Sequence, residues 1–294
     1  MSDSFFMFSV TPFYCKFLQN SGDLSFRAVV KCSLHGGNMA RKIVITSGKG
    51  GVGKTTLCAN LGIALAQKSL RVALLDFDMG LNNLDVAMNV DQRVVFDLID
   101  VVEGRCRVRQ ALIQDINEPT LYIMPSCHQA RRIVTVDMAK KVIQRMEDSF
   151  DYILIDCPAG IDSGFRRAVS CADEAIVVVT PHLSSVRDAD KVVGCLVNSG
   201  FTNIYTVVNR LRGDLVSSGE MLTPTEIFAL IGQTPLGIVP DDDHINCVTT
   251  AVGGRKPYQI LADNLHLGST KMYDCISRYK GLFGFMRRNI KRKV

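Results

Sequence analysis

The sequence predicts an α/β fold with a mostly parallel sheet flanked by helices on both faces. From residue 42 onward, short runs rich in Val, Ile and Leu alternate with longer amphipathic stretches. Strands that are apolar throughout are typical of a parallel sheet covered on both faces. The chain has 294 residues, 47% of them hydrophobic, so it can form a sizeable core.

The predicted elements alternate along the chain without a long linker or an internal repeat. The apolar runs that predict strands are 43–46, 72–75, 121–123, 152–155, 175–179, 204–208 and 236–239. The clearest predicted helices are 54–68, 135–147, 184–198 and 222–231. In the first of these helices Leu57, Leu61, Ala64 and Leu65 share one face. We therefore expect one α/β domain over 39–278.

Residues 1–38 differ in composition and hydrophobic pattern from the rest of the chain. Six phenylalanines occur in the first 26 residues without a helical or strand period. A strand pattern begins directly after Met39, and Gly36-Gly37-Asn38 fits an in-frame reading of a purine-rich ribosome-binding sequence. We interpret 1–38 as an extension, either a mis-called start upstream of a natural Met39 or a targeting segment.

A phosphate-binding loop follows the first predicted strand. Residues 48–55 fit G-x-x-x-x-G-K-[ST], with a strand before them and a helix after them. Glycines allow the backbone N–H groups to point inward, and the helix start adds the positive end of its dipole. We expect a nucleotide to be bound by Gly48, Lys49, Gly50, Gly51, Val52, Gly53, Lys54, Thr55 and Thr56.

Three residues of the loop have distinct expected roles. Lys54 can reach the β- and γ-phosphates, and the Thr55 hydroxyl can hold Mg²⁺. A phosphate loop does not generally need a second lysine, so Lys49 is expected to add stabilisation of charge in the transition state. We therefore assign catalytic roles to Lys49 and Lys54.

Carboxylates stand where two predicted strands end. Asp76 and Asp78 follow the strand 72–75, and Asp156 follows the strand 152–155. Ligands bind at the carboxyl ends of parallel strands. We expect Asp78 to position or polarise the attacking water, and Asp76 and Asp156 to support Mg²⁺ through its water shell.

The two-lysine loop resembles that of the deviant Walker A ATPases, the ParA/MinD family within the SIMIBI class of P-loop NTPases. The similarity extends over 39–294 and is carried by 39–41, 76–81, 83–85, 156–161, 172–175 and 184–188. One departure is Cys157, where serine is common. The resemblance implies an ATP-dependent sandwich homodimer in which Lys49 reaches the phosphates of the opposite subunit. It also implies that 76–85 and 156–164 are the two switch segments.

The resemblance further implies two segments beside the adenine. Asn209 and Arg210 follow the strand 204–208, and Pro240 and Asp242 follow the strand 236–239. Without the resemblance, both segments would be interpreted as ordinary turns.

Residues 279–294 predict an amphipathic helix for a membrane interface. Its apolar half contains Tyr279, Leu282, Phe283, Phe285, Met286 and Ile290, and its basic half contains Lys280, Arg287, Arg288, Lys291 and Arg292. The segment is short and contains Gly281 and Gly284, so we expect weak binding by one copy and tighter binding by two. A frayed basic terminus, a helix packed on the body and a calmodulin-type target are the alternatives.

The charge distribution argues against a nucleic-acid-binding body. Seven basic residues and no acid lie between 278 and 294, and the other 27 basic and 29 acidic residues leave the rest of the chain at −2. The ten cysteines contain no C-x-x-C pair, which disfavours an iron–sulfur scaffold. An electron-transfer reductase would need a cysteine at a dimer seam, and Cys157 does not match that position convincingly.

The resemblance implies an ATPase that positions the cell-division septum. ATP and Mg²⁺ are the expected substrate and cofactor, and ATP binding is expected to drive dimerisation and attachment to anionic lipids. The expected partners are the division inhibitor MinC and MinE or another topological factor, with no specific nucleic acid. The implied location is cytoplasmic and peripheral, on the inner face of the cell membrane. The alternative is a ParA-type DNA-segregation ATPase.

Overall fold

The computed structural model describes residues 39–79, 83–126, 134–242 and 256–279. These residues belong to one compact unit, Met39–Val294. The extension 1–38 and most of the expected membrane helix, from residue 280, lie outside the described residues.

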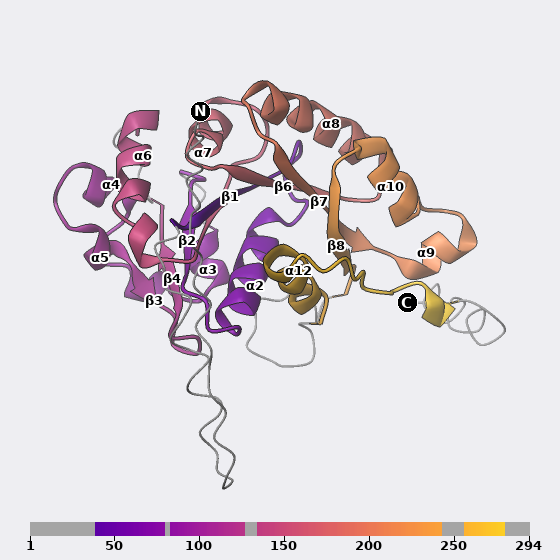
Figure 1. The fold of residues 1–294 in the computed structure, drawn as a ribbon, viewed down its shortest axis with the longest axis horizontal. Helices are drawn as coiled ribbons and strands as arrows, with labels where there is room; N and C mark the ends of the chain where they lie inside the picture. The colour runs from indigo at the N-terminus through magenta and orange to yellow at the C-terminus, as the bar shows by residue number, and fades with distance from the viewer. Residues whose placement is uncertain (1–38, 80–82, 127–133, 243–255, 280–294) are drawn as a thin grey trace, which may run out of the picture. The chain divides into compact units, whose positions relative to one another are not determined.

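The described strands form one eight-stranded sheet in the order β3-β4-β2-β5-β1-β6-β7-β8 (Figure 1). Their bounds are β1 Arg41–Thr46, β2 Val72–Asp76, β3 Ile113–Gln114, β4 Leu121–Met124, β5 Tyr152–Asp156, β6 Glu174–Val179, β7 Asn203–Leu211 and β8 Thr234–Pro240. All neighbours are parallel except β3 and β4. The predicted mostly parallel α/β sheet is therefore confirmed, and the antiparallel edge strand β3 was not predicted.

Helices cover both faces of the sheet, as Figure 1 shows. One face packs against α2 (Lys54–Ala66), α3 (Leu84–Ala87) and α12 (Lys256–Leu267). The opposite face packs against α4 (Leu98–Val102), α5 (Val108–Ala111), α6 (Val136–Gln144), α7 (Ser163–Val169), α8 (Leu183–Asn198), α9 (Gly213–Ser218) and α10 (Pro224–Ile231). The four predicted helices are α2, α6, α8 and α10. The short 3-10 helices are η2 (Asp91–Arg93), η3 (Glu147–Ser149) and η4 (Ser277–Tyr279).

Side-chain caps fix where two of these helices begin. Thr223 and Glu226 form a reciprocal capping box at the start of α10, and Pro224 occupies its first turn. The Asp162 carboxylate accepts hydrogen bonds from the N–H groups of Gly164 and Phe165 at 3.0 and 3.3 Å and so begins α7. The second expected switch segment therefore ends in a capped helix.

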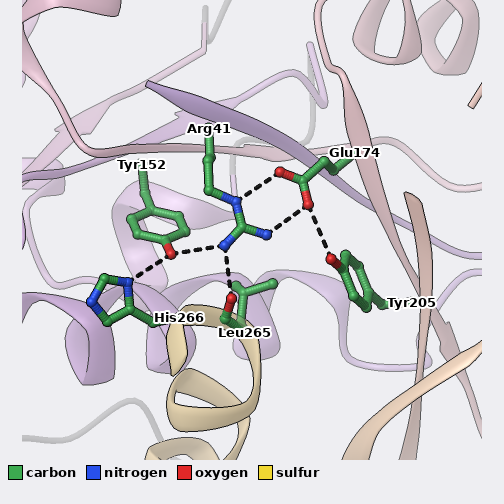
Figure 2. Close-up of polar contacts among 6 residues, drawn as sticks. All are labelled: Arg41, Tyr152, Glu174, Tyr205, Leu265 and His266. Atoms are coloured by element: carbon green, nitrogen blue, oxygen red, sulfur yellow. Dashed lines mark hydrogen bonds and ion pairs between the residues drawn. The ribbon is translucent and has the colours of Figure 1, made fainter. Parts of the chain in front are cut away.

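A polar network at the amino ends of the strands ties four strands to α12 (Figure 2). The Arg41 guanidinium donates to both carboxylate oxygens of Glu174 at 2.7 Å. It also donates to the Tyr152 hydroxyl at 3.0 Å and to the Leu265 carbonyl at 2.7 Å. The Tyr205 hydroxyl donates to Glu174 at 3.3 Å. The hydrogen bonds to Glu174 raise the pKa of Arg41 further above its usual value.

The Arg41–Glu174 pair is expected to stabilise the fold. Changing Glu174→Gln keeps the volume of the side chain but removes its charge, so it weakens charge-assisted hydrogen bonds in a largely buried place. We expect the free energy of unfolding to fall by about 2 kcal/mol, measured by urea denaturation. The exposed Asp190 on α8 supplies the control, because Asp190→Asn should leave the midpoint unchanged. Equal midpoints for the two variants would contradict the prediction.

Candidate functional site

The phosphate loop connects the carboxyl end of β1 to the start of α2. Gly51 and Gly53 adopt positive φ angles of 75° and 96°, which favour glycine. At Gly48, a Cβ atom would lie 2.3 Å from the backbone oxygen of Asp188, so only glycine fits. Gly53 is the N-cap of α2 and has no side chain to cap it. The first N–H groups of α2 can therefore bind an anion.

The two lysines of the loop have different environments. Lys54 is 8% exposed, and its Nζ donates to the Ser47 hydroxyl at 3.1 Å. The Ser47 hydroxyl donates to the Lys49 carbonyl at 2.8 Å. Lys49 itself is exposed. The structure therefore separates an internal lysine from one at the surface.

Thr55 and Asp156 meet at the base of the loop. The Thr55 hydroxyl donates to Oδ2 of Asp156 at 2.6 Å. Oδ1 of Asp156 is buried and has no hydrogen-bond partner among the residues that the structure describes. Burial raises the pKa of Asp156 to about 7, and the neighbouring Asp76 carboxylate adds to the shift. A hydroxyl beside an unpaired buried carboxylate oxygen fits Mg²⁺ and its bound water.

Asp76 holds the segment that follows β2. Its carboxylate is 1% exposed and accepts from the N–H of Asp78 at 2.8 Å and of Leu84 at 3.3 Å. Burial raises the pKa of Asp76 to about 6. The Asp78 carboxylate is only partly buried; its burial raises its pKa, and the Lys54 cation opposes that shift. Asp78 therefore lies within the electrostatic reach of the internal lysine.

A cavity of about 370 Å³ adjoins the outer side of the loop. Residues of the loop line it together with residues at or beyond the carboxyl ends of β6, β7 and β8, namely Lys49, Gly50, Gly51, Val52, Thr180, His182, Arg210, Arg212, Leu215, Met221 and Asp241. The cavity thus unites the predicted loop with the predicted Arg210. Pro240 is buried at the end of β8, and neither it nor Asp242 lines this cavity.

The side chain of Asn209 is oriented by the loop. Its Nδ2 donates to the Val52 carbonyl at 2.7 Å. Its Oδ1 is buried and has no hydrogen-bond partner within the described part of the chain. The next residue, Arg210, has a φ of 56°, so the backbone turns sharply at this point. Asn209 therefore keeps an acceptor oxygen for a ligand.

Four residues of this site were not predicted from the sequence. Ser47 precedes the motif by one residue and orients Lys54. Thr180, His182 and Arg212 line the cavity beside the loop. All four follow the carboxyl end of a strand or lie close to it. The rule that selected the aspartates could therefore have found them.

The residues expected at the membrane are Leu282, Phe283, Phe285, Met286, Arg287, Arg288, Ile290 and Lys291, and they lie outside the described residues. Tyr279 is described, and it is only 4% exposed. It belongs to η4, which packs beside α9 at Gly213. The body therefore includes Tyr279, which sequence analysis placed on the apolar face of the tail. Within the described ranges, no helix has the length and apolar character needed to cross a membrane.

Comparisons with known proteins agree with this geometry. A family model described as an AAA domain matches residues 40–197, more than half of the chain. The septum site-determining protein MinD of Bacillus subtilis is 49% identical over 212 residues, which cover 70% of this chain and 78% of that protein.

Two solved structures are also similar. A MinC:MinD cell division protein complex from Aquifex aeolicus has a TM-score of 0.73 and 37% identity, covering 80% of this chain and 99% of that one. MinD from Pyrococcus horikoshii, complexed with Mg-ADP, has a TM-score of 0.70 and 29% identity, covering 78% and 96%. A nucleotide site of this geometry in a chain so similar to these proteins leads to one conclusion: the chain belongs to the MinD family of septum site-determining proteins, cell-division members of the ParA-like P-loop NTPases.

Proposed function

We propose that this protein is an ATPase that positions the division septum by ATP-dependent dimerisation, membrane binding and recruitment of a division inhibitor. The observation that carries the proposal is the arrangement at one edge of the sheet. There, Lys54 is buried, the Thr55 hydroxyl donates to Asp156, and Lys49 is exposed. This arrangement leaves Lys54, Thr55 and Asp156 to serve the chain's own nucleotide and Lys49 to reach another copy. The family membership supports the same assignment.

Each residue of the site has a role in the proposed hydrolysis. Lys54 binds the β- and γ-phosphates, and the N–H groups of the loop and of α2 hold the remaining oxygens. Thr55 and Asp156 would hold Mg²⁺ with its water, which supplies charge neutralisation on the phosphates when bound, and Asp76 would support the same ion. Asp78 orients the attacking water, because its carboxylate is partly exposed beside Lys54.

We assign the adenine to the side of the loop that faces Asn209. The unpaired Oδ1 of Asn209 can accept a hydrogen bond from the 6-amino group of adenine. Guanine has a carbonyl oxygen at this position and could not donate. Arg210, Pro240 and Asp242 complete this side of the proposed nucleotide site. ATP is therefore the proposed substrate, and the Mg-ADP in the Pyrococcus protein supports this choice.

We propose a homodimer that encloses ATP, with Lys49 of each copy contacting the phosphates of the other. MinC is the proposed cargo, supported by the MinC:MinD complex from Aquifex aeolicus. MinE or another topological factor would stimulate release, and the protein would cycle between the cytoplasm and anionic lipids of the inner membrane face. A ParA-type DNA-segregation ATPase is the alternative, and a body charge of −2 argues against it.

We also propose a division of the chain into three parts. Residues 39–278 form the ATPase domain, preceded by the extension 1–38, and the family match from residue 40 supports that boundary. The C-terminal segment 279–294 forms the membrane helix. Within that segment, Tyr279 is buried in the body.

Removal of Lys54 is expected to impair ATP binding, whereas removal of Lys49 is expected to impair dimerisation. Lys54→Ala removes the internal cation, so the affinity for ATP should fall about 100-fold, measured by titration with a fluorescent ATP analogue. Lys49→Ala should bind ATP almost normally but lose the ATP-dependent dimer in analytical ultracentrifugation. A dimer that persists in Lys49→Ala would remove the assigned role of Lys49.

Asp78 is expected to act on turnover rather than on binding. Asp78→Ala removes the group that orients the attacking water, so steady-state hydrolysis should fall at least about 100-fold. The same variant should still form the ATP-dependent dimer, which serves as its folding and binding control. Hydrolysis at the normal rate would exclude Asp78 from the mechanism.

Membrane binding is expected to require both ATP and the tail. A chain that ends at Tyr279 keeps η4, which packs against the body, but lacks residues 280–294 of the proposed membrane helix. We expect the full chain to sediment with anionic liposomes in ATP but not in ADP, and the shortened chain to sediment in neither. Sedimentation of the full chain without nucleotide would contradict the coupling. ATP-dependent binding to duplex DNA without lipid affinity would favour the ParA-type alternative.

A further inference from the structure

A second cavity lies at the opposite ends of the strands from the nucleotide site. It has a volume of about 400 Å³ and is bounded by α5, by the end of α6 and by residues beside β2 and β4. Figure 1 shows these elements at the β3–β4 edge of the sheet. Arg71 lines this cavity directly before β2, whereas Asp76 and Asp78 lie at the other end of that strand. Cavities that bind small ligands have volumes of about 300–1,000 Å³.

Three arginines from three separate segments line this cavity. Arg71 comes from the loop before β2, Arg109 from α5 and Arg145 from the end of α6. Arg109 and Arg145 are exposed and form no ion pair with any other residue that the structure describes. Their convergence concentrates positive charge in a chain whose body carries a net −2.

The third arginine is only weakly neutralised. The Nε of Arg71 is buried, has no hydrogen-bond partner within the described ranges and lies 3.9 Å from Oδ2 of Asp151. That carboxylate oxygen already accepts the backbone N–H of Arg71 at 2.7 Å. Among the described residues, Asp151 is the only carboxylate in an ion pair with any of the three arginines, and no acidic residue lines the cavity, so its lining is positively charged.

The remaining wall of the cavity is aromatic and apolar. The rings of Tyr122 and Phe150 pack edge to face, with centroids 5.5 Å apart and planes at 73°. Ser149 also lines the cavity. An inorganic ion would use the arginines alone, whereas a ligand with a flat or apolar body would also contact the rings.

We propose that this arginine pocket, lined by Arg71, Arg109, Arg145, Tyr122, Ser149 and Phe150, binds a soluble organic phosphate with an aromatic or apolar body. Guanidinium groups bind phosphate through paired hydrogen bonds. A phosphate monoester carries a charge of about −2 at neutral pH, whereas a carboxylate carries a single negative charge. Three guanidinium groups therefore match a phosphate monoester better than a carboxylate. The site is separate from the nucleotide site, and the proposal does not depend on the proposed ATPase function.

Arg145 lies at the C-terminal end of α6, where the negative end of the helix dipole stabilises a cation whether or not a ligand binds. That effect accounts for one arginine at one helix end. It does not account for the approach of Arg71 and Arg109 from other segments to the same cavity.

Phenyl phosphate tests the proposal, because it carries one phosphate on an aromatic body. The full chain is first saturated with Mg-ADP so that the phosphate loop is occupied, and binding is then measured by isothermal titration calorimetry. We expect saturable binding that weakens with added salt and that is tighter than the binding of inorganic phosphate. Arg109→Gln and Arg145→Gln should each weaken it about tenfold.

Arg107→Gln is the matched control, because Arg107 is exposed beside α5 but does not line the cavity. This variant should bind phenyl phosphate normally, and all three variants should keep the urea midpoint of the parent chain. The absence of saturable binding to the ADP-loaded chain would overturn the proposal, as would unchanged binding by a chain carrying both Arg109→Gln and Arg145→Gln.

A lipid headgroup is the other source of a phosphate monoester. The chain ending at Tyr279 distinguishes the two sources with vesicles that contain phosphatidate. We expect this chain not to sediment with them while it still binds phenyl phosphate. Sedimentation that requires Arg109 and Arg145 would overturn the assignment to a soluble ligand.

Discussion

Parallel pairing of three central strands is the constraint on which the nucleotide site depends. β5 lies between β1 and β2, and in this register Asp156 pairs with Ile45 on one side and with Asp76 on the other. Parallel strands place their carboxyl ends at one edge. The loop after β1 and the two carboxylates therefore meet although 101 residues separate Thr55 from Asp156. A shift of one residue would turn every side chain of a strand to the opposite face and break its packing against the helices there.

Buried charge is handled differently at the two ends of the strands. At the amino ends, Glu174 is buried beside Arg41, which donates two hydrogen bonds to it. At the carboxyl ends, burial without an equivalent cation raises the pKa of Asp156 to about 7 and that of Asp76 to about 6. An acid whose pKa is raised on folding destabilises the native state as the pH increases through that range. The fold thus places the Arg41–Glu174 ion pair away from the nucleotide site. Asp76 and Asp156, which form no ion pair with another described residue, lie where a cation would bind.

The sequence predicted the features that depend on local pattern. Each predicted apolar run forms a strand, and the loop motif lies between β1 and α2. Both features could be predicted because each depends on a pattern within only a few consecutive residues. The two-residue strand β3 is too short to show a period. The Arg41–Glu174 pair joins residues that are 133 positions apart in the sequence, so no local pattern could predict it. Spacing likewise could not show that Tyr279 is buried, since it continues the apolar pattern of the tail.

The unequal burial of the two loop lysines gives a physical reason for the proposed coupling of nucleotide binding to dimerisation. Lys54 is already partly desolvated and hydrogen-bonded to Ser47, so little reorganisation is needed when phosphates arrive. Lys49 keeps its hydration in a single copy because it is exposed. In the proposed dimer, the cost of desolvating Lys49 is offset when the second copy brings the phosphates of its nucleotide against this cation. On this proposal the triphosphate joins the two copies, and the proposed dimer would bring two weakly binding membrane segments together, so that they bind lipid more tightly than one.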